Sequence, residues 1–219
     1  MKTNKVAFAG KMCSGKTTMA EYLVNNHGFT RVAMGDQIKK VSNMVIEDMA
    51  ALKKYLNEMT PEFSEEIYTE FAEYKELNKN AVFVKQGPIY LKNEAYRGLT
   101  QKTGDIVRSK YGSDVWIMLL MKEADKIIEN NGKVVCDDVR LKEEKNIFEN
   151  EEYFLFKLEI DVEEQEKRIL NMYNTYDPKA LEHKTETDLD DVVFSENNKI
   201  DTSVLSKEEC YQYIENQLK

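Results

Sequence analysis

Eight residues near the amino terminus constrain the fold more than any other part of the chain. Residues 10–17 read Gly-Lys-Met-Cys-Ser-Gly-Lys-Thr and fit the pattern G-x-x-x-x-G-K-[ST]. The glycines at both ends let a loop curl so that successive backbone N–H groups point at phosphate oxygens. Lys16 would reach the β- and γ-phosphates, and the Thr17 hydroxyl would bind Mg²⁺. The pattern therefore predicts a loop that holds the phosphates of a nucleotide.

The residues on either side of this loop predict its structural context. Residues 6–9 form a short apolar run, which is typical of a buried strand. Apolar residues then recur at helical spacing over residues 16–27, and Gly28 follows where a helix would end. Residues 30–34 read as a second strand. Strand, loop, helix and strand in this order form the unit of a parallel sheet with a crossover helix.

The rest of the chain extends this pattern to an α/β fold with a helical insertion. Helical spacing dominates residues 37–130, with a short extended excursion predicted at 81–91. Further strands are predicted at 134–138, 153–160 and 191–194. The 219 residues are expected to form one domain. Its core is predicted at 1–36 and 131–219, with the insertion at 37–130 and a lid-like segment at about 161–190.

Composition excludes several classes of protein. The chain has 31 Lys and Arg against 40 Asp and Glu, which gives a net charge of −9. Nucleic acids and anionic lipids bind clustered cations, so neither is an expected partner. No apolar run approaches the ~18 residues of a membrane span. We expect a cytoplasmic protein, and the sequence leaves its oligomeric state open, a homodimer included.

The three cysteines are scattered and read as reduced thiols rather than a disulfide framework. Cys13 alone lies inside the predicted phosphate loop, beside Lys16 and a helix amino terminus. Both neighbours favour the thiolate unless burial offsets them. We therefore expect Cys13 to be more reactive than the other two, Cys136 and Cys210.

Carboxylates follow two predicted strands, where a parallel sheet binds its ligands. Asp36 follows the second strand and could orient a nucleophile or receive its proton, but an N-cap of the next helix explains it equally well. Asp137 and Asp138 end the apolar run of the third strand. One of them could hold Mg²⁺, and we favour this over a turn that merely begins at a strand end.

Two arginines share a narrow stripe of one predicted helix. At about 100° per residue, Arg97, Gln101 and Arg108 lie on one side. The opposite side carries mostly apolar residues, namely Tyr96, Leu99, Thr103, Ile106 and Val107. Two guanidiniums with an amide between them suit a phosphate and a base edge. A solvent-exposed helix face is the simpler explanation of the stripe taken alone.

Two other motifs have plain alternatives. Arg168 follows the fourth predicted strand and could reach the phosphates from a lid, or could pair with Glu164 one helical turn away. Residues 198–201, Asn-Lys-Ile-Asp, match the N-K-x-D signature that reads guanine in GTPases. No D-x-x-G element lies between them and the phosphate loop, so we treat the match as coincidental.

In their order and spacing, these elements resemble the deoxynucleoside monophosphate kinases of tailed bacteriophages. That family is related to nucleoside monophosphate and dephospho-CoA kinases. The chain departs from the family pattern at Gly35, which replaces an alanine, and at residues 141–143, Leu-Lys-Glu in place of Phe-Pro-Asn. Residues 47–91 diverge and leave the preferred base open. The shared elements are the loop at 10–16, Gly35-Asp36-Gln37-Ile38-Lys39, Arg97, Gln101, Gly104, Arg108, Asp114-Val115-Trp116, Asp138, Arg140, Glu144, His183, Glu186, and Asn197 or Asn198.

The resemblance implies a three-layer P-loop kinase fold with a helical substrate-binding insertion, and transfer of the ATP γ-phosphoryl group to a (deoxy)nucleoside 5′-monophosphate. ATP is implied as co-substrate with Mg²⁺, and the location is the cytoplasm, a host cytoplasm if a phage encodes the chain. The implied catalytic residues are Lys16, Asp36, Arg140 and Arg168. ATP is assigned to Gly10, Lys11, Cys13, Ser14, Gly15, Lys16, Thr17 and Thr18. The acceptor is assigned to Asp36, Lys39, Arg97, Gln101, Arg108, Trp116, Glu144, His183 and Glu186. Mg²⁺ is assigned to Thr17 and Asp138.

Two functional alternatives stay open. One is another small-molecule P-loop kinase, such as a dephospho-CoA kinase-like enzyme. The other is a P-loop module that binds or hydrolyses nucleotide as a switch or an assembly component. No physical argument beyond the resemblance supports His183 and Glu186, and an exposed loop histidine is the simpler explanation of His183.

Overall fold

The computed structural model describes residues 3–59, 61–91, 93–174, 176 and 178–219. The chain divides into two compact units. We call Met1–Ala33 with Glu123–Lys219 the core unit, and Met34–Lys122 the helical unit.

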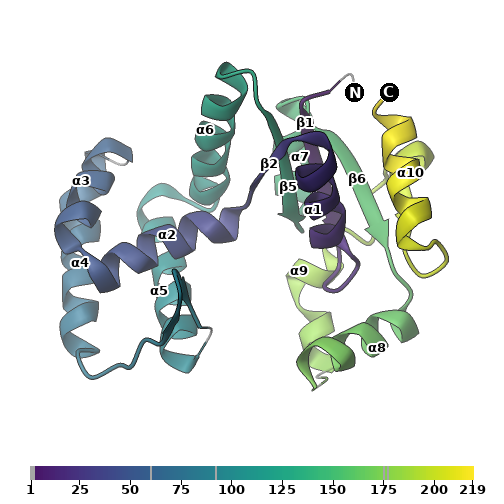
Figure 1. Ribbon diagram of the computed structural model, residues 1–219. Helices are drawn as coiled ribbons and strands as arrows, with labels where there is room; N and C mark the ends of the chain where they lie inside the picture. Colours follow the sequence, from purple (N-terminus) through teal and green to yellow (C-terminus); the bar gives the residue numbers. More distant parts are fainter. Residues whose placement is uncertain (1–2, 60, 92, 175, 177) are drawn as a thin grey trace. The chain divides into compact units, whose positions relative to one another are not determined.

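The core unit is built on a parallel sheet with the strand order β2-β5-β1-β6-β7. Figure 1 labels the first four of these strands. Its strands are β1 Lys5–Gly10, β2 Phe29–Val32, β5 Lys133–Val139, β6 Phe154–Glu159 and β7 Lys199–Asp201. Its helices are α1 Lys16–His27, α7 Lys142–Asn150, α8 Val162–Tyr173, α9 Lys184–Thr187 and α10 Lys207–Gln217. Short 3₁₀ helices occupy Pro178–Glu182 and Glu196–Asn198.

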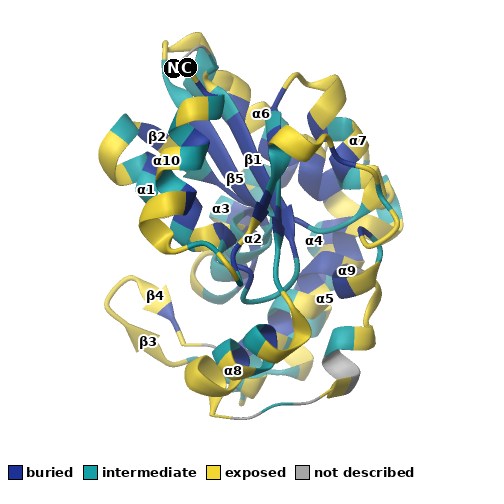
Figure 2. Ribbon diagram, turned by 90° about the vertical axis from the view of Figure 1, so that its right-hand side faces the viewer, coloured by how far each residue is buried: buried dark blue, intermediate teal, exposed yellow. Residues whose placement is uncertain are grey.

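Both faces of the sheet are buried, which explains why its central strands read as continuous apolar runs. Val6 and Phe8 of β1 share a core with α1 and α10. The alternate residues Ala7 and Ala9 are also fully buried. Figure 2 shows β1 and β5 as almost entirely buried, whereas the helices around them keep exposed outer faces. Each fully buried Phe or Leu contributes about 1.5–3 kcal/mol to the stability of this core.

The strand order places a ligand site beside β1. The chain leaves β1 toward β2 on one side, and leaves the neighbouring strand β6 toward β7 on the other. Such a reversal opens a crevice outside the carboxyl ends of the two strands. Gly10 ends β1 at this crevice.

The predicted fold class is confirmed: the protein is α/β, with a parallel central sheet, helices and a phosphate-loop motif between β1 and α1. The helix predicted at 16–27 matches α1, and the strands predicted at 6–9, 134–138 and 153–160 match β1, β5 and β6 within one residue at each end. The second strand ends earlier than predicted, because α2 already begins at Met34.

The predicted last strand is wrong. Residues 191–194 are irregular, and the strand at this edge of the sheet is β7, Lys199–Asp201. It contains most of the coincidental Asn-Lys-Ile-Asp match. Only Ile200 of β7 is buried, so the strand carries almost no hydrophobic pattern of its own. Pairing with β6, Leu158 opposite Ile200, decides its conformation.

The helical unit packs around its own apolar core, which includes Leu52, Phe71, Leu99 and Trp116. Its elements are α2 Met34–Glu47, α3 Met49–Met59, a 3₁₀ helix Pro61–Phe63, α4 Ser64–Leu77, β3 Lys85–Gln86, β4 Ile89–Tyr90 and α5 Glu94–Tyr111. Helix α6, Val115–Glu129, begins in this unit and ends in the core unit. The extended excursion predicted at 81–91 is the hairpin β3–β4.

The structure tests the predictions for Asp36 and for the exposed face of α5. Asp36 is not an N-cap, because it is the third residue of α2 and lies in its first turn. The predicted face of α5 is confirmed, since Arg97, Gln101 and Arg108 are exposed while the residues predicted opposite them are buried.

No helix among the described residues is long and apolar enough to cross a membrane.

Candidate active site

The loop between β1 and α1 has the geometry that its glycines allow. Gly10 has φ 146° and Gly15 has φ 96°, both in the region that favours glycine. A Cβ on Gly10 would lie 2.5 Å from the carbonyl oxygen of Leu158 in the neighbouring strand. Glycine at this position therefore lets the loop start close against β6.

Lys16 turns back over this loop. Its Nζ donates hydrogen bonds to the carbonyl oxygens of Gly10 at 2.7 Å and Lys11 at 2.5 Å. Burial, followed by the nearby Arg140 guanidinium, lowers the pKa of Lys16 to about 7. Glu186 and Asp137 act in the opposite direction on the same pKa. The ammonium group thus lies among charges of both signs, inside the loop predicted to hold phosphates.

Thr17 contacts a carboxylate at the end of β5. Its hydroxyl donates to Oδ2 of Asp137 at 2.7 Å, and Oδ1 of Asp137 is 2.8 Å from Nη2 of Arg31. Asp137 is almost fully buried, and Arg31 compensates its charge. Asp138 points to the other face of β5, where its Oδ1 accepts from the Cys136 thiol at 3.0 Å. Asp137, and not the Asp138 assigned from the resemblance, is the carboxylate beside Thr17.

A hydroxyl and a carboxylate oxygen at this position fit Mg²⁺. Mg²⁺ takes oxygen ligands and is commonly held by one or two carboxylates together with substrate phosphates. Thr17 and Asp137 supply one oxygen of each kind, at the amino terminus of α1. Among the described residues no cluster of three or more His, Cys, Asp or Glu side chains forms a metal cage. The donor set therefore suits a cation that arrives with phosphate oxygens.

Arg140 and Glu186 bring distant parts of the chain to the loop. The Arg140 guanidinium donates a short hydrogen bond to Oε1 of Glu186. Oε2 of Glu186 accepts from the backbone N–H of Met12 at 2.6 Å. Glu186 is only 7% exposed. Its carboxylate thus bridges the loop and the residue that follows β5.

The segment after β6 holds the loop at further points. Gln165 of α8 donates to the carbonyl of Met12 at 2.9 Å. Arg168 donates to the carbonyls of Cys13 at 3.3 Å and Thr202 at 2.6 Å. It also pairs with Glu164 at 2.9 Å, as the simpler explanation of this arginine predicted. In this conformation Arg168 contacts the phosphate loop through backbone oxygens, so it positions the loop.

That Cys13 is more reactive than the other two cysteines stays a prediction: Cys13 is half-buried, whereas Cys136 and Cys210 are buried. Burial raises the pKa of the Cys13 thiol, and this effect outweighs Lys16, which lowers it. Glu186 raises the same pKa further. The predicted thiolate is therefore disfavoured, because desolvation and a nearby carboxylate oppose the local positive charges.

A second candidate site lies in the helical unit. Helices α2 and α5 line an open groove of about 580 Å³, with the three cations Lys39, Arg97 and Arg108. Lys39 donates to Oδ1 of Asp36 at 2.6 Å. The Arg108 guanidinium has no hydrogen-bond or ion-pair partner among the residues that the structure describes. The other lining residues are Gly35, Ile38, Tyr96, Thr100, Gln101, Gly104 and Asp105.

Gly104 explains how Arg108 reaches this groove. A Cβ on Gly104 would lie 2.9 Å from Nη1 of Arg108. The guanidinium therefore lies over the bare backbone of the preceding helical turn. A glycine in the middle of a helix costs roughly 0.5–1 kcal/mol relative to alanine, and here it makes room for the arginine.

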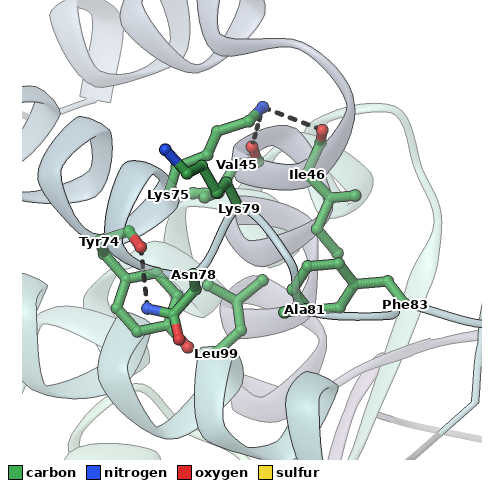
Figure 3. A pocket seen from close by; sticks show the side chains of 9 residues that line it. All are labelled: Val45, Ile46, Tyr74, Lys75, Asn78, Lys79, Ala81, Phe83 and Leu99. Atoms are coloured by element: carbon green, nitrogen blue, oxygen red, sulfur yellow. Dashed lines mark hydrogen bonds between the residues drawn. The ribbon is translucent and has the colours of Figure 1, made fainter.

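A second hollow of the helical unit has the opposite character, and Figure 3 shows the side chains that line it. Its volume is about 180 Å³. Its walls are mainly apolar, with Phe83 and Leu99 among them. Its cations are already engaged: Lys75 donates to the carbonyls of Val45 at 2.7 Å and Ile46 at 3.0 Å. Lys79 pairs with a glutamate of α4. The groove with Arg108, and not this pocket, therefore has a positive charge to offer an anion.

Three residues that the resemblance assigns to the acceptor do not line this groove. Trp116 is 2% exposed and packs in the core of the helical unit, where its Nε1–H donates weakly to the carbonyl of Gly104 at 3.4 Å. Glu144 accepts from the backbone N–H groups of Arg140 at 2.7 Å and Leu141 at 3.0 Å, so it fixes the start of α7. His183 is exposed just before α9. Packing explains Trp116, and helix capping explains Glu144.

Sequence reasoning missed Arg31 and Gln165. Arg31 lies in the middle of a predicted strand, where a charged residue gives no sign of its partner across the sheet. Gln165 is buried in α8 and looks like an ordinary polar residue of an acidic helix. The alternation of side chains along β5 could have distinguished Asp137 from Asp138. It places Asp137 on the same face as Val135, which packs with α1.

Comparisons with known proteins show the fold and no family. No protein-family model matches the chain, and no curated protein sequence does. The crystal structure of TT1252 from Thermus thermophilus matches with a TM-score of 0.50 and 16% identity, covering all of both chains. The dephospho-CoA kinase from Campylobacter jejuni matches with a TM-score of 0.42 and 17% identity, over 99% of this chain and 96% of that one. The first similarity supports the α/β fold, and the second is too low to carry an argument.

Proposed function

We propose that this protein is a P-loop phosphotransferase that moves the γ-phosphoryl group of ATP to a small phosphorylated acceptor. The observation that carries the proposal is the groove of the helical unit, in which the Arg108 guanidinium has no hydrogen-bond or ion-pair partner among the described residues and lines the same wall as Arg97 and Lys39. A nucleotide-binding switch needs only the phosphate loop. A kinase whose acceptor is a phosphate monoester needs a second anion site, and arginine is suited to it because its planar fork binds two oxygens.

We further propose a (deoxy)nucleoside 5′-monophosphate as the acceptor. The side-chain amide of Gln101 lies on the same helix face as the two arginines and can pair with a base edge. A groove of about 580 Å³ is within the size range of sites for ligands as large as a nucleotide. The resemblance to the phage enzymes favours the same acceptor. A dephospho-CoA kinase-like enzyme would instead phosphorylate a hydroxyl group, so it is a distinct outcome of the assay below.

In the proposed reaction, an acceptor phosphate oxygen forms a bond to the γ-phosphorus, and the bond from that phosphorus to the β-phosphate oxygen breaks. The products are ADP and a nucleoside diphosphate. Lys16 and the loop amides hold the β- and γ-phosphates, and Arg140 neutralises charge on the transferring group. Thr17 and Asp137 would hold Mg²⁺, which supplies charge neutralisation at the phosphate oxygens. Asp36 orients the acceptor together with its ion-pair partner Lys39.

The test is the release of ADP from ATP and Mg²⁺ with a panel of acceptors: the four dNMPs, the four NMPs and dephospho-CoA. We expect rapid release with one or more monophosphates. Lys16→Ala, checked for folding by circular dichroism, is the matched inactive control. Rapid release with dephospho-CoA alone would replace the proposed acceptor, and no acceptor-dependent release by a folded protein that binds ATP would contradict the kinase function.

A further inference from the structure

The carboxylate of Glu186 occupies hydrogen-bond donors that the proposed function gives to phosphate. Oε2 accepts from the N–H of Met12, a backbone donor of the phosphate loop, at 2.6 Å. Oε1 accepts from the guanidinium of Arg140. Carboxylate and phosphate oxygens compete for such donors, because both are anionic acceptors that prefer N–H groups and guanidiniums. Glu186 therefore binds the loop as a phosphate oxygen would.

The electrostatics of the loop support the same interpretation. Arg140 lowers the pKa of Lys16, so the two cations repel each other at close range in a buried place. Glu186 raises the pKa of Lys16 and of Cys13, so its charge acts on two side chains of the loop. Buried charges are costly unless they are paired. Glu186 is the anion from the far end of the chain that offsets this pair of cations.

We propose that Glu186 is a built-in competitor of the nucleotide, which must be displaced from Met12 and Arg140 before the phosphates of ATP can bind there. This inference rests on the proposed ATP site. A carboxylate and a triphosphate in the same poorly solvated loop would repel each other strongly. One backbone N–H also cannot make a full hydrogen bond to both acceptors.

Displacement of Glu186 would release a defined segment. Glu186 lies on α9, a helix of only four residues. Three further contacts fix the residues just after it: Asp190 pairs with Lys11 at 3.0 Å, Asp188 accepts from the N–H of Lys142 at 2.7 Å, and the carbonyl of Leu189 accepts from Nζ of Lys157 at 3.2 Å. Both Asp188 and Asp190 lie outside regular helix. Loss of the Glu186 bridge therefore loosens residues 184–190 while the nucleotide orders the loop.

The first experiment measures binding of ATP, and of inorganic tripolyphosphate, by isothermal titration calorimetry. Glu186→Gln keeps the size of the side chain and removes its charge, so we expect both ligands to bind about tenfold more tightly than to the wild type. Glu186→Asp keeps the charge but shortens the reach, and an intermediate gain is expected. Glu182→Gln, an exposed neighbour with the same change in net charge, should bind like the wild type.

The outcomes separate the inference from the proposed function. Unchanged or weaker binding by Glu186→Gln, with a wild type that binds ATP, would overturn the competitor role and leave the kinase function standing. A wild type that binds neither ATP nor tripolyphosphate would instead overturn the phosphate site itself. Thermal unfolding of each variant checks that it is folded.

Hydrogen exchange on the wild-type protein gives a second test that needs no variant. If ATP displaces Glu186, amides of residues 12–18 should exchange more slowly with ATP, and those of residues 184–190 should exchange faster. A glutamate that only fixes Arg140 predicts slower exchange in both segments, and that result would refute the displacement.

Discussion

The phosphate loop of the core unit and the groove of the helical unit are both rich in cations. They differ in whether these cations have hydrogen-bond or ion-pair partners within the protein. In the loop, Lys16 is held by backbone carbonyls and Arg140 by Glu186. In the groove, Arg108 has no such partner among the described residues. A loop that compensates its charges internally must exchange those contacts for a ligand. A groove with an uncompensated guanidinium can bind an anion without breaking any contact of that group.

The largest effect should come from removing the central cation of the loop. We expect Lys16→Ala to lower kcat by about 10³-fold or more, because the ammonium stabilises charge that develops on the phosphates during transfer. Burial already lowers the pKa of Lys16, so its loss should cost little folding stability. Steady-state kinetics and thermal unfolding measure the two effects. Retention of most of the turnover by this variant would show that the loop is not the reaction centre.

Substitutions of the two arginines in the groove should change only the kinetics with the acceptor. Arg108→Ala and Arg97→Ala should each lower kcat/KM for the best monophosphate by about 30- to 150-fold, equivalent to about 2–3 kcal/mol. The binary affinity for ATP should stay nearly unchanged. Arg→Lys should restore only part, since an ammonium lacks the two-pronged geometry. Lys102→Ala, an exposed change on the same helix, is the control. Kinetics like those of the wild type in both arginine variants would leave α5 as an ordinary exposed helix face.

A smaller effect, specific to the position of the Arg108 guanidinium, is expected from a substitution of Gly104. Gly104→Ala places a methyl group 2.9 Å from the present position of Nη1 of Arg108, and the guanidinium must move. We expect a loss of roughly five- to tenfold in kcat/KM, about 1–1.4 kcal/mol. Gly98→Ala is the matched control on the same helix, because its Cβ would meet only the Tyr74 hydroxyl, at 3.9 Å. Both variants gain helix propensity. Equal kinetics in the two would show that the position of Arg108 over Gly104 does not matter.

The smallest effect concerns Cys13, and its sign follows from the raised pKa. Because burial raises the pKa of the Cys13 thiol, the thiolate is disfavoured near neutral pH, so alkylation by iodoacetamide should be slow there and accelerate as the pH rises. The rate is measured by mass spectrometry of the peptide that contains Cys13. Saturating ATP should protect this residue if it lies in the nucleotide loop. Fast alkylation at pH 7 would mean that the thiolate is stabilised after all.

The sequence alone was enough to predict the features that depend on local patterns. The two glycines and Lys16 predicted the loop, because backbone conformation and spacing lie within eight residues. The period of apolar residues predicted α1 and the exposed face of α5 that carries Arg97 and Arg108. Such patterns determine where a side chain points relative to its own helix or strand.

Only the tertiary structure decided which distant groups meet. Thr17 contacts Asp137 across 120 residues, and Met12 contacts Glu186 across 174. From the residues alone, either Asp137 or Asp138 could hold the metal, because both end the same strand, and the resemblance selected Asp138. The two side chains lie on opposite faces of β5, and Asp137 is the one beside Thr17. Strand β7 formed where no pattern predicted it, because its hydrogen bonds to β6 outweigh its weak local preference. Local periodicity encodes a face but not a partner, and the partners come from the packing of the whole unit.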